Sequence, residues 1–243
     1  MKGKLWVVGI GPGGYEQMTM RAASVIDACD VIAGYTVYTD LIKAHFPDKE
    51  ILTTPMRQEE KRCRMAIERA LAGSRVAMVC SGDAGVYGMA GLILELCEQY
   101  PPLDVEIVSG VTAALSGAAA LGAPLMHDFA VISLSDLMKP WETIEKRLAA
   151  CASADMGICL YNPASRKRAD YLKKACEIIM KYQPAETVCG LVRQIGREGE
   201  ESQVMSLREL ADYQADMFTT VFIGNSKTRV IGDRMVTPRG YKI

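Results

Sequence analysis

Three short segments in the first half of the chain, all predicted to be strands, each end in a glycine-rich loop. The segments cover residues 4–10, 75–80 and 104–108, and the loops that follow them cover residues 11–14, 81–85 and 109–113. The first two are apolar runs typical of buried strands in a parallel sheet. Because the carboxyl ends of parallel strands meet at one edge, where ligands usually bind, we expect the three loops to form a ligand site.

The rest of the chain continues the alternation of strands and helices. Further strands are expected at residues 30–34, 130–134, 157–161, 187–192 and 218–223, and helices at 19–29, 58–72, 89–100, 113–121, 141–151 and 165–181. This order predicts an α/β fold with a largely parallel sheet. The length of 243 residues, with 49% hydrophobic residues, allows two lobes. We place their boundary between residues 1–115 and 116–243.

Charge and composition exclude several classes of protein. A formal net charge of −1 argues against a nucleic-acid partner, whose phosphates require a basic excess. The most apolar long stretch, residues 105–126, is interrupted by glycine, serine and proline, and no signal peptide is evident, so we expect a cytoplasmic protein without a membrane span. The eight cysteines form no C-x-x-C pair, which favours buried thiols and no metal site.

The first glycine loop formally matches a dinucleotide-binding motif. Gly9, Gly11 and Gly14 give G-x-G-x-x-G after a strand. However, a proline stands inside the motif, the predicted helix begins only at Thr19, and the second strand ends without a carboxylate to hold a ribose. A phosphate loop is also disfavoured, because no Gly-Lys-Ser/Thr follows. An NAD(P) or nucleotide site is therefore not expected here.

Two side chains stand out in the other glycine loops. Asp83 lies beside Gly82 at a strand end, either as a ligand contact or as the N-cap of the following helix, and the two roles are compatible. Thr112 stands at the entrance of an alanine-rich helix, where it is well placed for a ligand. Tyr87 and Tyr161 suit either the apolar wall of a pocket or ordinary core packing.

Several segments together resemble one protein family. Gly9-Ile10-Gly11-Pro12-Gly13 resembles the first motif of the tetrapyrrole methylase superfamily. Within that superfamily, longer stretches resemble the precorrin-3B C17-methyltransferases, namely residues 81–91, 121–137, 160–165, and 224–226 with 235–241. The resemblance extends from residue 4 to residue 241.

The resemblance implies a fold, a reaction and a cofactor. It implies two α/β lobes with the cofactor cleft between them, and S-adenosylmethionine as methyl donor, leaving S-adenosylhomocysteine. The reaction would be C17-methylation with ring contraction of precorrin-3B or cobalt-precorrin-3B in cobalamin biosynthesis, by a homodimer. Implied cofactor contacts are Gly82, Asp83, Val86, Thr112 and Ala113 in the first lobe, with Tyr161, Val192 and Thr219 in the second. Gly11, Pro12 and Gly13 would lie beside the tetrapyrrole.

The chemistry suggests further candidates. Methyl transfer from a sulfonium to an electron-rich carbon needs positioning, and neither a metal nor a covalent nucleophile. The carboxylates of the ring need cations, preferably arginine. Arg193 is the first choice; residues 57–64 include further cations but suit a solvated helix face, and other candidates are Arg166, Lys167, Arg168, Arg197 and Arg239. His127 and Asp128 could serve proton transfer, although a structural role is an alternative.

Two other functions stay open from the residues. The chain could methylate another position of a tetrapyrrole or a modified protein side chain. It could also bind a tetrapyrrole without turnover. Whether the substrate carries cobalt is undecided, with a weak preference for the cobalt-bearing ring.

Overall fold

The three segments that end in glycine loops form neighbouring parallel strands. In the computed structural model, which describes residues 3–165 and 168–242, they are β4 (Arg75–Cys80), β1 (Lys4–Gly9) and β5 (Asp104–Val108). Strand β1 lies between the other two, with Gly9 opposite Cys80 and Val8 opposite Val108. All three glycine loops therefore leave the same edge of one sheet.

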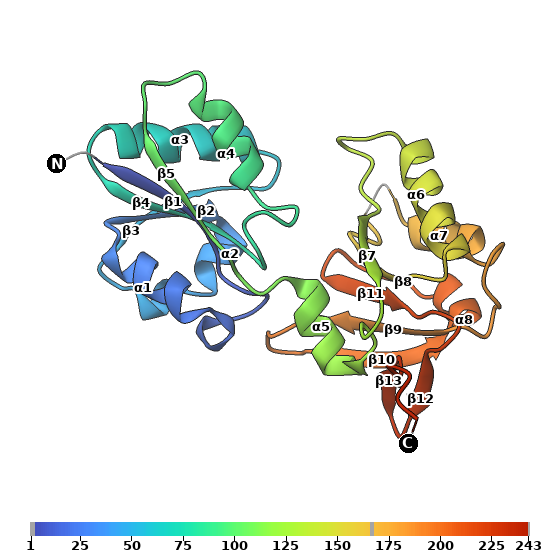
Figure 1. The fold of residues 1–243 in the computed structure, drawn as a ribbon. Coiled ribbons are helices and arrows are strands. Elements are labelled where there is room, and N and C mark those ends of the chain that lie inside the picture. The colour runs from blue at the N-terminus through green and yellow to red at the C-terminus, as the bar shows by residue number, and fades with distance from the viewer. Residues whose placement is uncertain (1–2, 166–167, 243) are drawn as a thin grey trace. The chain divides into compact units, whose positions relative to one another are not determined.

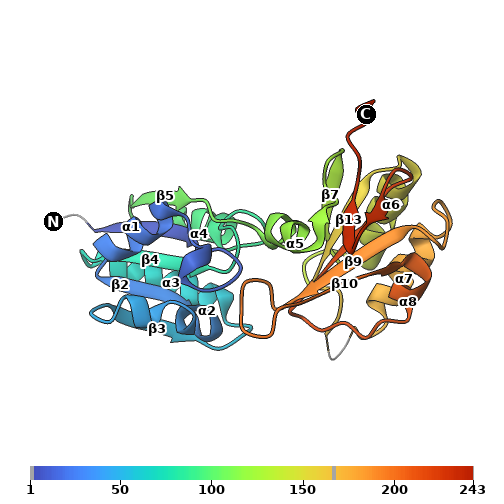
Figure 2. The ribbon, with the colours of Figure 1, turned by 90° about the horizontal axis from the view of Figure 1, so that it is seen from below.

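The first of two compact units, Met1–Ala113, is built around this sheet. The sheet is entirely parallel in the order β3-β2-β4-β1-β5, and Figure 2 shows β5, β4, β2 and β3 in sequence across it. The remaining elements are η1 (Tyr15–Gln17), α1 (Met20–Ala28), β2 (Val31–Tyr35), α2 (Thr36–Asp40), η2 (Lys43–His45), β3 (Glu50–Thr54), α3 (Glu59–Leu71) and α4 (Ala90–Cys97).

Alternating side chains of the first sheet bury two separate cores. Leu5 and Val7 of β1 pack with α3 and α4 on one face, whereas Val8 and Ile10 pack with α1 on the other. Figure 1 shows these helices covering opposite faces of the sheet. This three-layer arrangement follows from the period of two along each strand, because both faces of a central strand are apolar.

The second unit, Ala114–Ile243, has a different sheet. Its elements, with α5 crossing the boundary, are α5 (Ala113–Leu121), β6 (Gly122–Ala123), β7 (Phe129–Ser133), α6 (Trp141–Ser153), β8 (Gly157–Tyr161), α7 (Tyr171–Ile179), β9 (Val188–Arg193), β10 (Glu201–Ser206), α8 (Leu207–Ala211), β11 (Thr219–Ile223), β12 (Arg229–Ile231) and β13 (Arg234–Val236). The main sheet has the order β10-β9-β11-β8-β7, and β12, β13 and β6 form a small second sheet.

The expectation of a largely parallel sheet is wrong for this unit. Only β7 and β8 pair in parallel within its main sheet, while β11 runs antiparallel between β8 and β9, and β10 runs antiparallel to β9. Strands β9 and β10 form a hairpin whose connection includes Gln194, Gly196 and Gly199 with positive φ angles. Such left-handed positions let the chain reverse directly, so no helical crossover is needed.

Both faces of the second main sheet are covered by helices. Helices α6, α7 and α8 bury Ile158, Leu160 and Leu191 on one face. Helix α5 approaches the other face closely, because a Cβ added at Gly117 would lie 2.8 Å from the Phe222 ring. Likewise, a Cβ at Gly190 would lie 2.8 Å from Leu121. The small residues of α5 thus serve close packing, as expected for this alanine-rich helix.

Most local predictions agree with the structure. Thr19 is the N-cap of α1 and accepts a hydrogen bond from Ala22 N at 3.1 Å. The helix expected from residue 165 is shorter, because α7 begins only at Tyr171. Several short elements were not predicted from the sequence: α2, β3, β10 and α8, with five or six residues each, and β6, β12 and β13, with two or three. Elements this short carry too few periodic positions to be recognised.

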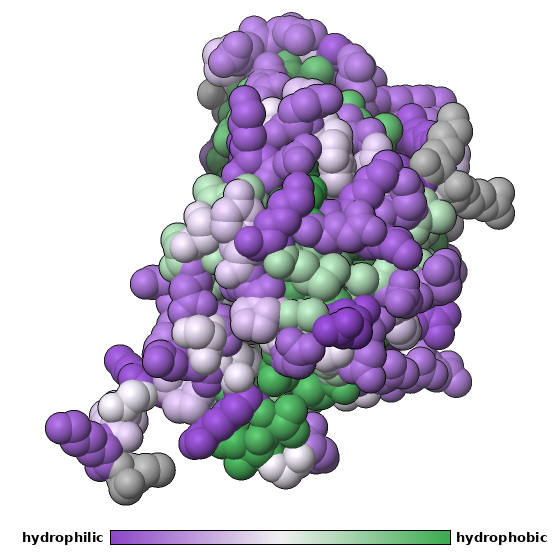
Figure 3. All heavy atoms as spheres, turned by 90° about the vertical axis from the view of Figure 1, so that its right-hand side faces the viewer, coloured by the Kyte–Doolittle hydropathy of each residue, from purple (hydrophilic) through white to green (hydrophobic). Residues whose placement is uncertain are grey.

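The cysteines form no disulfide bonds: all eight are free thiols. Burial raises the pKa of the Cys29 and Cys63 thiols to about 12. Across residues 3–165 and 168–242, we find no group of three or more potential metal-ligating side chains. Nor does any helix in those ranges combine the length and apolar character needed to cross a bilayer. Figure 3 shows a small apolar patch at the end of the second unit that carries β12, where Val230 and Ile231 are half exposed.

Candidate functional site

The glycine loops of the first unit are joined backbone to backbone. Gly11 N donates to Gly82 O at 3.0 Å, and Gly82 N donates to Gly11 O at 2.7 Å. Both glycines have positive φ angles, 77° and 70°, which disfavour a side chain. The first loop, in which Pro12 and Gly13 follow Gly11, is therefore attached to the second loop by main-chain atoms alone at this point.

The third loop packs equally closely against the other two. A Cβ added at Gly110 would lie 2.2 Å from Gly82 O and 2.5 Å from the carbonyl carbon of Gly9. A Cβ at Gly9 would lie 2.6 Å from Gly110 N. These spacings leave no room for a side chain at Gly9 or Gly110, so the three loops pack against one another through main-chain atoms.

Asp83 organises these loops through its carboxylate. Its Oδ1 accepts hydrogen bonds from Gly85 N at 2.8 Å and Val86 N at 3.1 Å, and its Oδ2 accepts from Gly110 N at 2.9 Å. The N-cap interpretation of Asp83 is wrong, because α4 begins after Met89 and the Asp83 carboxylate closes its own loop instead. Asp83 therefore fixes the second loop and ties it to the third.

The other cofactor residues expected in this unit lie beside Asp83. A Cβ at Gly82 would lie 3.6 Å from Thr112 Cα and 3.8 Å from Ala113 N, so the second and third loops run alongside each other. Val86 is 37% exposed at the outer end of the second loop. The structure thus brings Gly82, Asp83, Thr112 and Ala113 together at the carboxyl edge of β4 and β5.

One edge of the second sheet holds Tyr161 and Val192 near the carboxyl ends of β8 and β9, and Thr219 at the amino end of β11. Tyr161 ends β8, and its hydroxyl accepts a hydrogen bond from Ala114 N at 2.6 Å. Val192 is fully buried, and Thr219 is 3% exposed with its hydroxyl donating to Asp216 Oδ1 at 2.8 Å. Val192 and Thr219 can therefore offer a ligand little except main-chain atoms.

Arg193 is already paired within its own unit. Its Nε donates to Asp216 Oδ2 at 2.8 Å, and its Nη1 lies 3.9 Å from Glu201 Oε2. The hydrogen bond to Asp216 raises the pKa of Arg193. Burial opposes ionisation of Asp216, but hydrogen bonds from Thr219 and Arg193 hold its pKa below the ordinary value. The positive charge of Arg193 is thus partly neutralised by Asp216, which makes Arg193 a weaker candidate for binding the carboxylates of the substrate.

A polar network at the ends of β7 and β8 was not anticipated as a unit. Arg168 donates from Nη1 to Ser135 Oγ at 2.7 Å and Asp136 Oδ1 at 3.2 Å, and from Nε to Ser165 Oγ at 3.0 Å. Tyr171 donates its hydroxyl to Asp136 Oδ2 at 2.7 Å. One feature of the sequence could have indicated this network: residues 133–136 and 162–165 both fall in the stretches that resemble the family.

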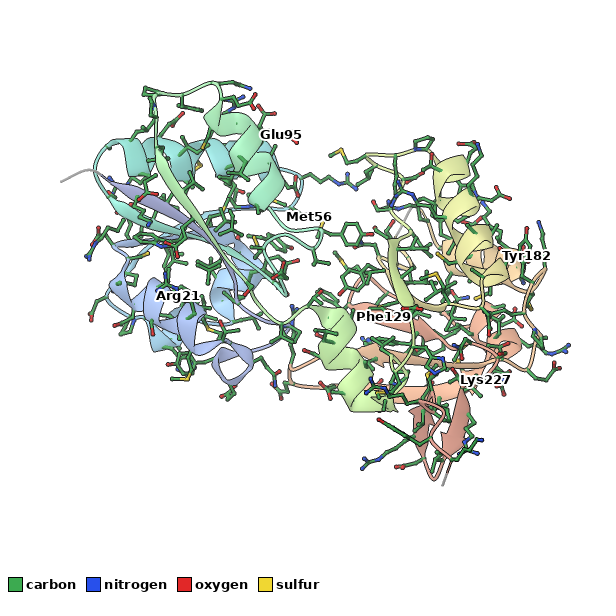
Figure 4. All side chains as sticks on the ribbon, viewed as in Figure 1. Arg21, Met56, Glu95, Phe129, Tyr182 and Lys227 are labelled. Atoms are coloured by element: carbon green, nitrogen blue, oxygen red, sulfur yellow. The ribbon has the colours of Figure 1, made fainter. Side chains whose placement is uncertain are left out.

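His127 and Asp128 lie at the opposite edge of the second sheet. They precede β7 and, with Asp155, Asn225 and Lys227, line an open pocket of about 530 Å³. Figure 4 labels Lys227 and Phe129, the residue that follows Asp128. Because β8 runs parallel to β7, its five residues separate this pocket from Tyr161 by about 13 Å. The structure does not bring the His127–Asp128 pair to the edge that holds Tyr161.

The remaining basic candidates divide by burial. The solvated-face interpretation of residues 57–64 is wrong for Arg62, which is 5% exposed and donates to Thr54 Oγ1 at 2.6 Å. Arg57 and Lys61 are exposed, and Arg64 pairs with Glu60. Arg166 and Lys167 lie outside the described residues. The guanidinium of Arg197 stands 5.6 Å from the Phe218 ring.

Fold and site together define a class. Two α/β units, the first with glycine-rich loops at the carboxyl ends of parallel strands, agree with the fold that the resemblance to the tetrapyrrole methylases implies. The family model of tetrapyrrole (corrin/porphyrin) methylases matches residues 4–211, and the chain belongs to this family. Within the family, its close relatives are named C17-methyltransferases of cobalamin biosynthesis.

Two relatives illustrate the match in sequence. A probable cobalt-factor III C(17)-methyltransferase of Salmonella typhimurium is 46% identical over 98% of this chain and 100% of the relative. A precorrin-3B C(17)-methyltransferase of a Sinorhizobium species is 41% identical over 99% of this chain and 98% of the relative. These alignments cover both units and nearly the whole length of each partner.

Solved structures share the fold. The crystal structure of the methyltransferase CobJ superposes with a TM-score of 0.89 at 35% identity, covering 97% of this chain and 100% of CobJ. A uroporphyrin-III C-methyltransferase from Thermus thermophilus, solved with S-adenosylhomocysteine, has a TM-score of 0.73 at 18% identity over 91% of this chain and 97% of its own. At that identity the likeness shows the fold alone.

Proposed function

We propose that this chain transfers a methyl group from S-adenosylmethionine to C17 of a precorrin-3B-type ring and couples this step to ring contraction. The main support is the full-length match to relatives named for that reaction, at 46% and 41% identity. The carboxyl edge of β4 and β5 adds physical support, because the second and third loops run alongside each other where parallel sheets usually bind ligands. The preferred substrate is the cobalt-bearing ring, after the name of the Salmonella relative.

The donor set of the first unit suits an adenosine-containing cofactor. When bound, S-adenosylmethionine supplies an electrophilic methyl group on a sulfonium. The main chain around Thr112 and Ala113 offers neutral donors and acceptors, which suit an adenine and a ribose better than a phosphate. No carboxylate ends β2, consistent with a ligand that is not a dinucleotide.

The second unit would contribute from the edge of its sheet that holds Tyr161. Tyr161 offers an aromatic face, and Val192 and Thr219 offer peptide groups at the ends of β9 and β11. The polycarboxylate ring would be held by cations. Arg168 is a candidate, with its guanidinium fixed by Ser135, Ser165 and Asp136, but Asp136 partly neutralises its charge, as Asp216 does that of Arg193. We do not assign the proton transfers of ring contraction to His127 and Asp128, because β8 separates them from Tyr161.

The chemistry of the chain itself is positional. Methyl transfer forms a bond between the methyl carbon and C17 as the carbon–sulfur bond breaks, and that electron pair returns to sulfur. What the protein must provide is alignment of the two carbons and exclusion of water, which can account for much of a rate enhancement. Rigid main-chain loops locked by Asp83 are suited to such alignment.

Incubation with both candidate rings tests the proposal. The chain is mixed under anaerobic conditions with S-adenosylmethionine labelled with ¹³C in its methyl group, and with either the cobalt-bearing or the metal-free ring. We expect the mass gain of one methyl group with the cobalt-bearing ring, and a ¹³C resonance at C17 of a contracted macrocycle. Label at another ring position would favour the alternative, a methylase of a different site.

Binding and assembly are tested separately from turnover. Calorimetry with S-adenosylhomocysteine should show micromolar binding, whereas tetrapyrrole binding without cofactor binding would favour a non-catalytic carrier. The proposal includes a homodimer, a cytoplasmic location and a cofactor shared by both units. Sedimentation gives the number of copies, and a crystal grown with S-adenosylhomocysteine shows which residues contact it.

A further inference from the structure

The segment that leads from the first unit to the second is held at both ends by a side-chain oxygen. Asp83 Oδ2 accepts from Gly110 N at 2.9 Å, and the Tyr161 hydroxyl accepts from Ala114 N at 2.6 Å. Gly110 belongs to the first unit and Ala114 is the first residue of the second. We propose that Asp83 and Tyr161 are positioning residues, which act on Thr112 and Ala113 by fixing this backbone.

The Asp83 end is anchored firmly. Its carboxylate accepts three main-chain N–H groups, two from its own loop and one from Gly110. Hydrogen bonds to an ionised acceptor are roughly twice as strong as neutral ones. Because the Asp83 carboxylate already accepts from three peptide N–H groups, the side chain acts on the loops, and a ligand would meet the loop backbone that it orients.

The Tyr161 end is anchored at a helix terminus. Helix α5 begins at Ala113, so Ala114 N is one of the first-turn donors that have no partner within the helix. The Tyr161 hydroxyl satisfies this donor from the carboxyl end of β8. It thereby fixes the start of α5 on the second sheet, which α5 also contacts through Gly117.

The residues between the anchors are those expected to meet the cofactor. Only Val111, Thr112 and Ala113 separate Gly110 from Ala114. Each end is fixed within its own unit, so the main-chain groups next to Gly110 and next to Ala114 are each preorganised for a ligand. The inference rests on the proposed function for the identity of that ligand, but the anchoring itself does not.

Two conservative variants remove one anchor each. Asp83→Asn keeps an acceptor for the second loop but replaces one carboxylate oxygen by an amide nitrogen, which cannot accept from Gly110 N. Tyr161→Phe removes the acceptor for Ala114 N and keeps the ring. Matched controls are Asp48→Asn and Tyr182→Phe, because both of those side chains are exposed and remote in sequence from the loops.

Hydrogen exchange tests the anchoring without any ligand. Exchange of the amides of residues 110–114, followed by mass spectrometry, should accelerate in Asp83→Asn and Tyr161→Phe and stay unchanged in both controls. Unchanged protection in both anchor variants would overturn the inference. This readout does not depend on cofactor, so it stays decisive even if wild-type protein binds no S-adenosylhomocysteine, a result that would instead count against the proposed function.

A double variant then separates positioning from direct contact. Each single variant should weaken S-adenosylhomocysteine binding about tenfold, the effect of losing one hydrogen bond of about 1.4 kcal/mol. If both residues act through one backbone segment, releasing the second end adds little, so the double variant should lose far less than a hundredfold. Two independent contacts with the cofactor would give additive free energies and about a hundredfold loss, which contradicts positioning.

Discussion

The two units build the sheet edge at the carboxyl ends of their parallel strands from different materials. In the first unit, Gly9, Gly82 and Gly110 bring three loops together through peptide groups. In the second, the ends of β7 and β8 are joined by side chains, with Arg168 and Tyr171 converging on Asp136. The packing at the first edge excludes side chains at the three glycines. The second edge depends on the charges and hydroxyl groups of particular side chains.

This difference predicts how each edge fails. The edge of the first unit should be sensitive to any added atom, and among charged groups it should depend on Asp83, whose carboxylate joins the second loop to the third. A side-chain edge should tolerate changes in volume but depend on hydrogen bonding and pH. Each unit contains one of the two tryptophans, Trp6 in β1 and Trp141 in α6, so the fluorescence of Trp141→Phe and Trp6→Phe backgrounds reports the units separately.

The largest effect is expected from Gly110→Ala. Its Cβ would lie 2.2 Å from Gly82 O, a main-chain atom that cannot move without its strand. Overpacking of this kind typically destabilises by 1–3 kcal/mol, and we expect about 3 kcal/mol for the unit reported by Trp6. Gly91→Ala in α4 is the control: nothing lies within 4 Å of its Cβ, so it should stabilise by about 0.5 kcal/mol. Urea unfolding measures the change in unfolding free energy of both variants. Equal changes for Gly110→Ala and Gly91→Ala would show that the close packing at Gly110 does not matter for stability.

Arg168→Met should weaken the second unit by about 2 kcal/mol, because Asp136 loses its ionic partner and two serines lose a donor. The side chain is only 16% exposed, so solvent cannot replace these bonds fully. Arg208→Met is the control, since Arg208 and Glu186 form an exposed pair with little expected value. The urea midpoint reported by Trp141 fluorescence should decrease in Arg168→Met and stay unchanged in Arg208→Met. A shift in the Trp6 signal instead would contradict the separation of the units.

A pH dependence should follow from Tyr171. Its hydroxyl is the main cause of the lowered pKa of Asp136, with Arg168 a lesser one. A depressed pKa in the folded state stabilises the protein above the ordinary value of 3.8, and that stabilisation is lost as the pH falls below it. Tyr171→Phe should therefore reduce the loss of Trp141-reported stability between pH 6 and pH 3, a pair of values chosen to bracket that pKa. An identical pH profile would show that the hydrogen bond does not matter for folding.

The smallest effect is expected at Gln183, and it has the opposite sign. Both amide atoms of this side chain are buried without a hydrogen-bond partner among the described residues. An unsatisfied buried polar group destabilises, so Gln183→Met, of similar size, should stabilise the second unit by about 1 kcal/mol. Thermal unfolding can resolve this change. Destabilisation instead would indicate that a buried water satisfies the amide in solution.

The positions of most long elements follow from local patterns. The strands at 75–80 and 157–161 agree residue for residue with β4 and β8, because their apolar runs define their own ends. The strand at 104–108 agrees with β5, whose carboxyl end is marked by the glycine loop that follows it. Thr19 likewise determines where α1 begins. The short strands β3 and β10 lie at the sheet edges, and their sequences lack a continuous apolar run. Such strands form because a neighbouring strand pairs with them, so their own residues do not predict their positions.

Site residues divide in the same way. The three glycine loops could be grouped from sequence, because parallel strands bring their carboxyl ends to one edge. Sequence could not predict the hydrogen-bond partners of Asp83 and Arg193. It also could not predict that His127 lies far from Tyr161. These features depend on the direction in which each strand enters the sheet, and on which loop lies within 3 Å of a given oxygen.

The amino-acid sequence alone therefore determined the α/β class, the grouping of the glycine loops at one edge and the resemblance to the tetrapyrrole methylases, because these depend on residue types at fixed spacing. Only the tertiary structure decided that the second sheet is mixed, that Arg62 is buried, and that Asp83 and Tyr161 hold the two ends of one segment. Hydrogen bonds between residues 27 or 47 positions apart depend on how complete elements pack, which no local pattern encodes.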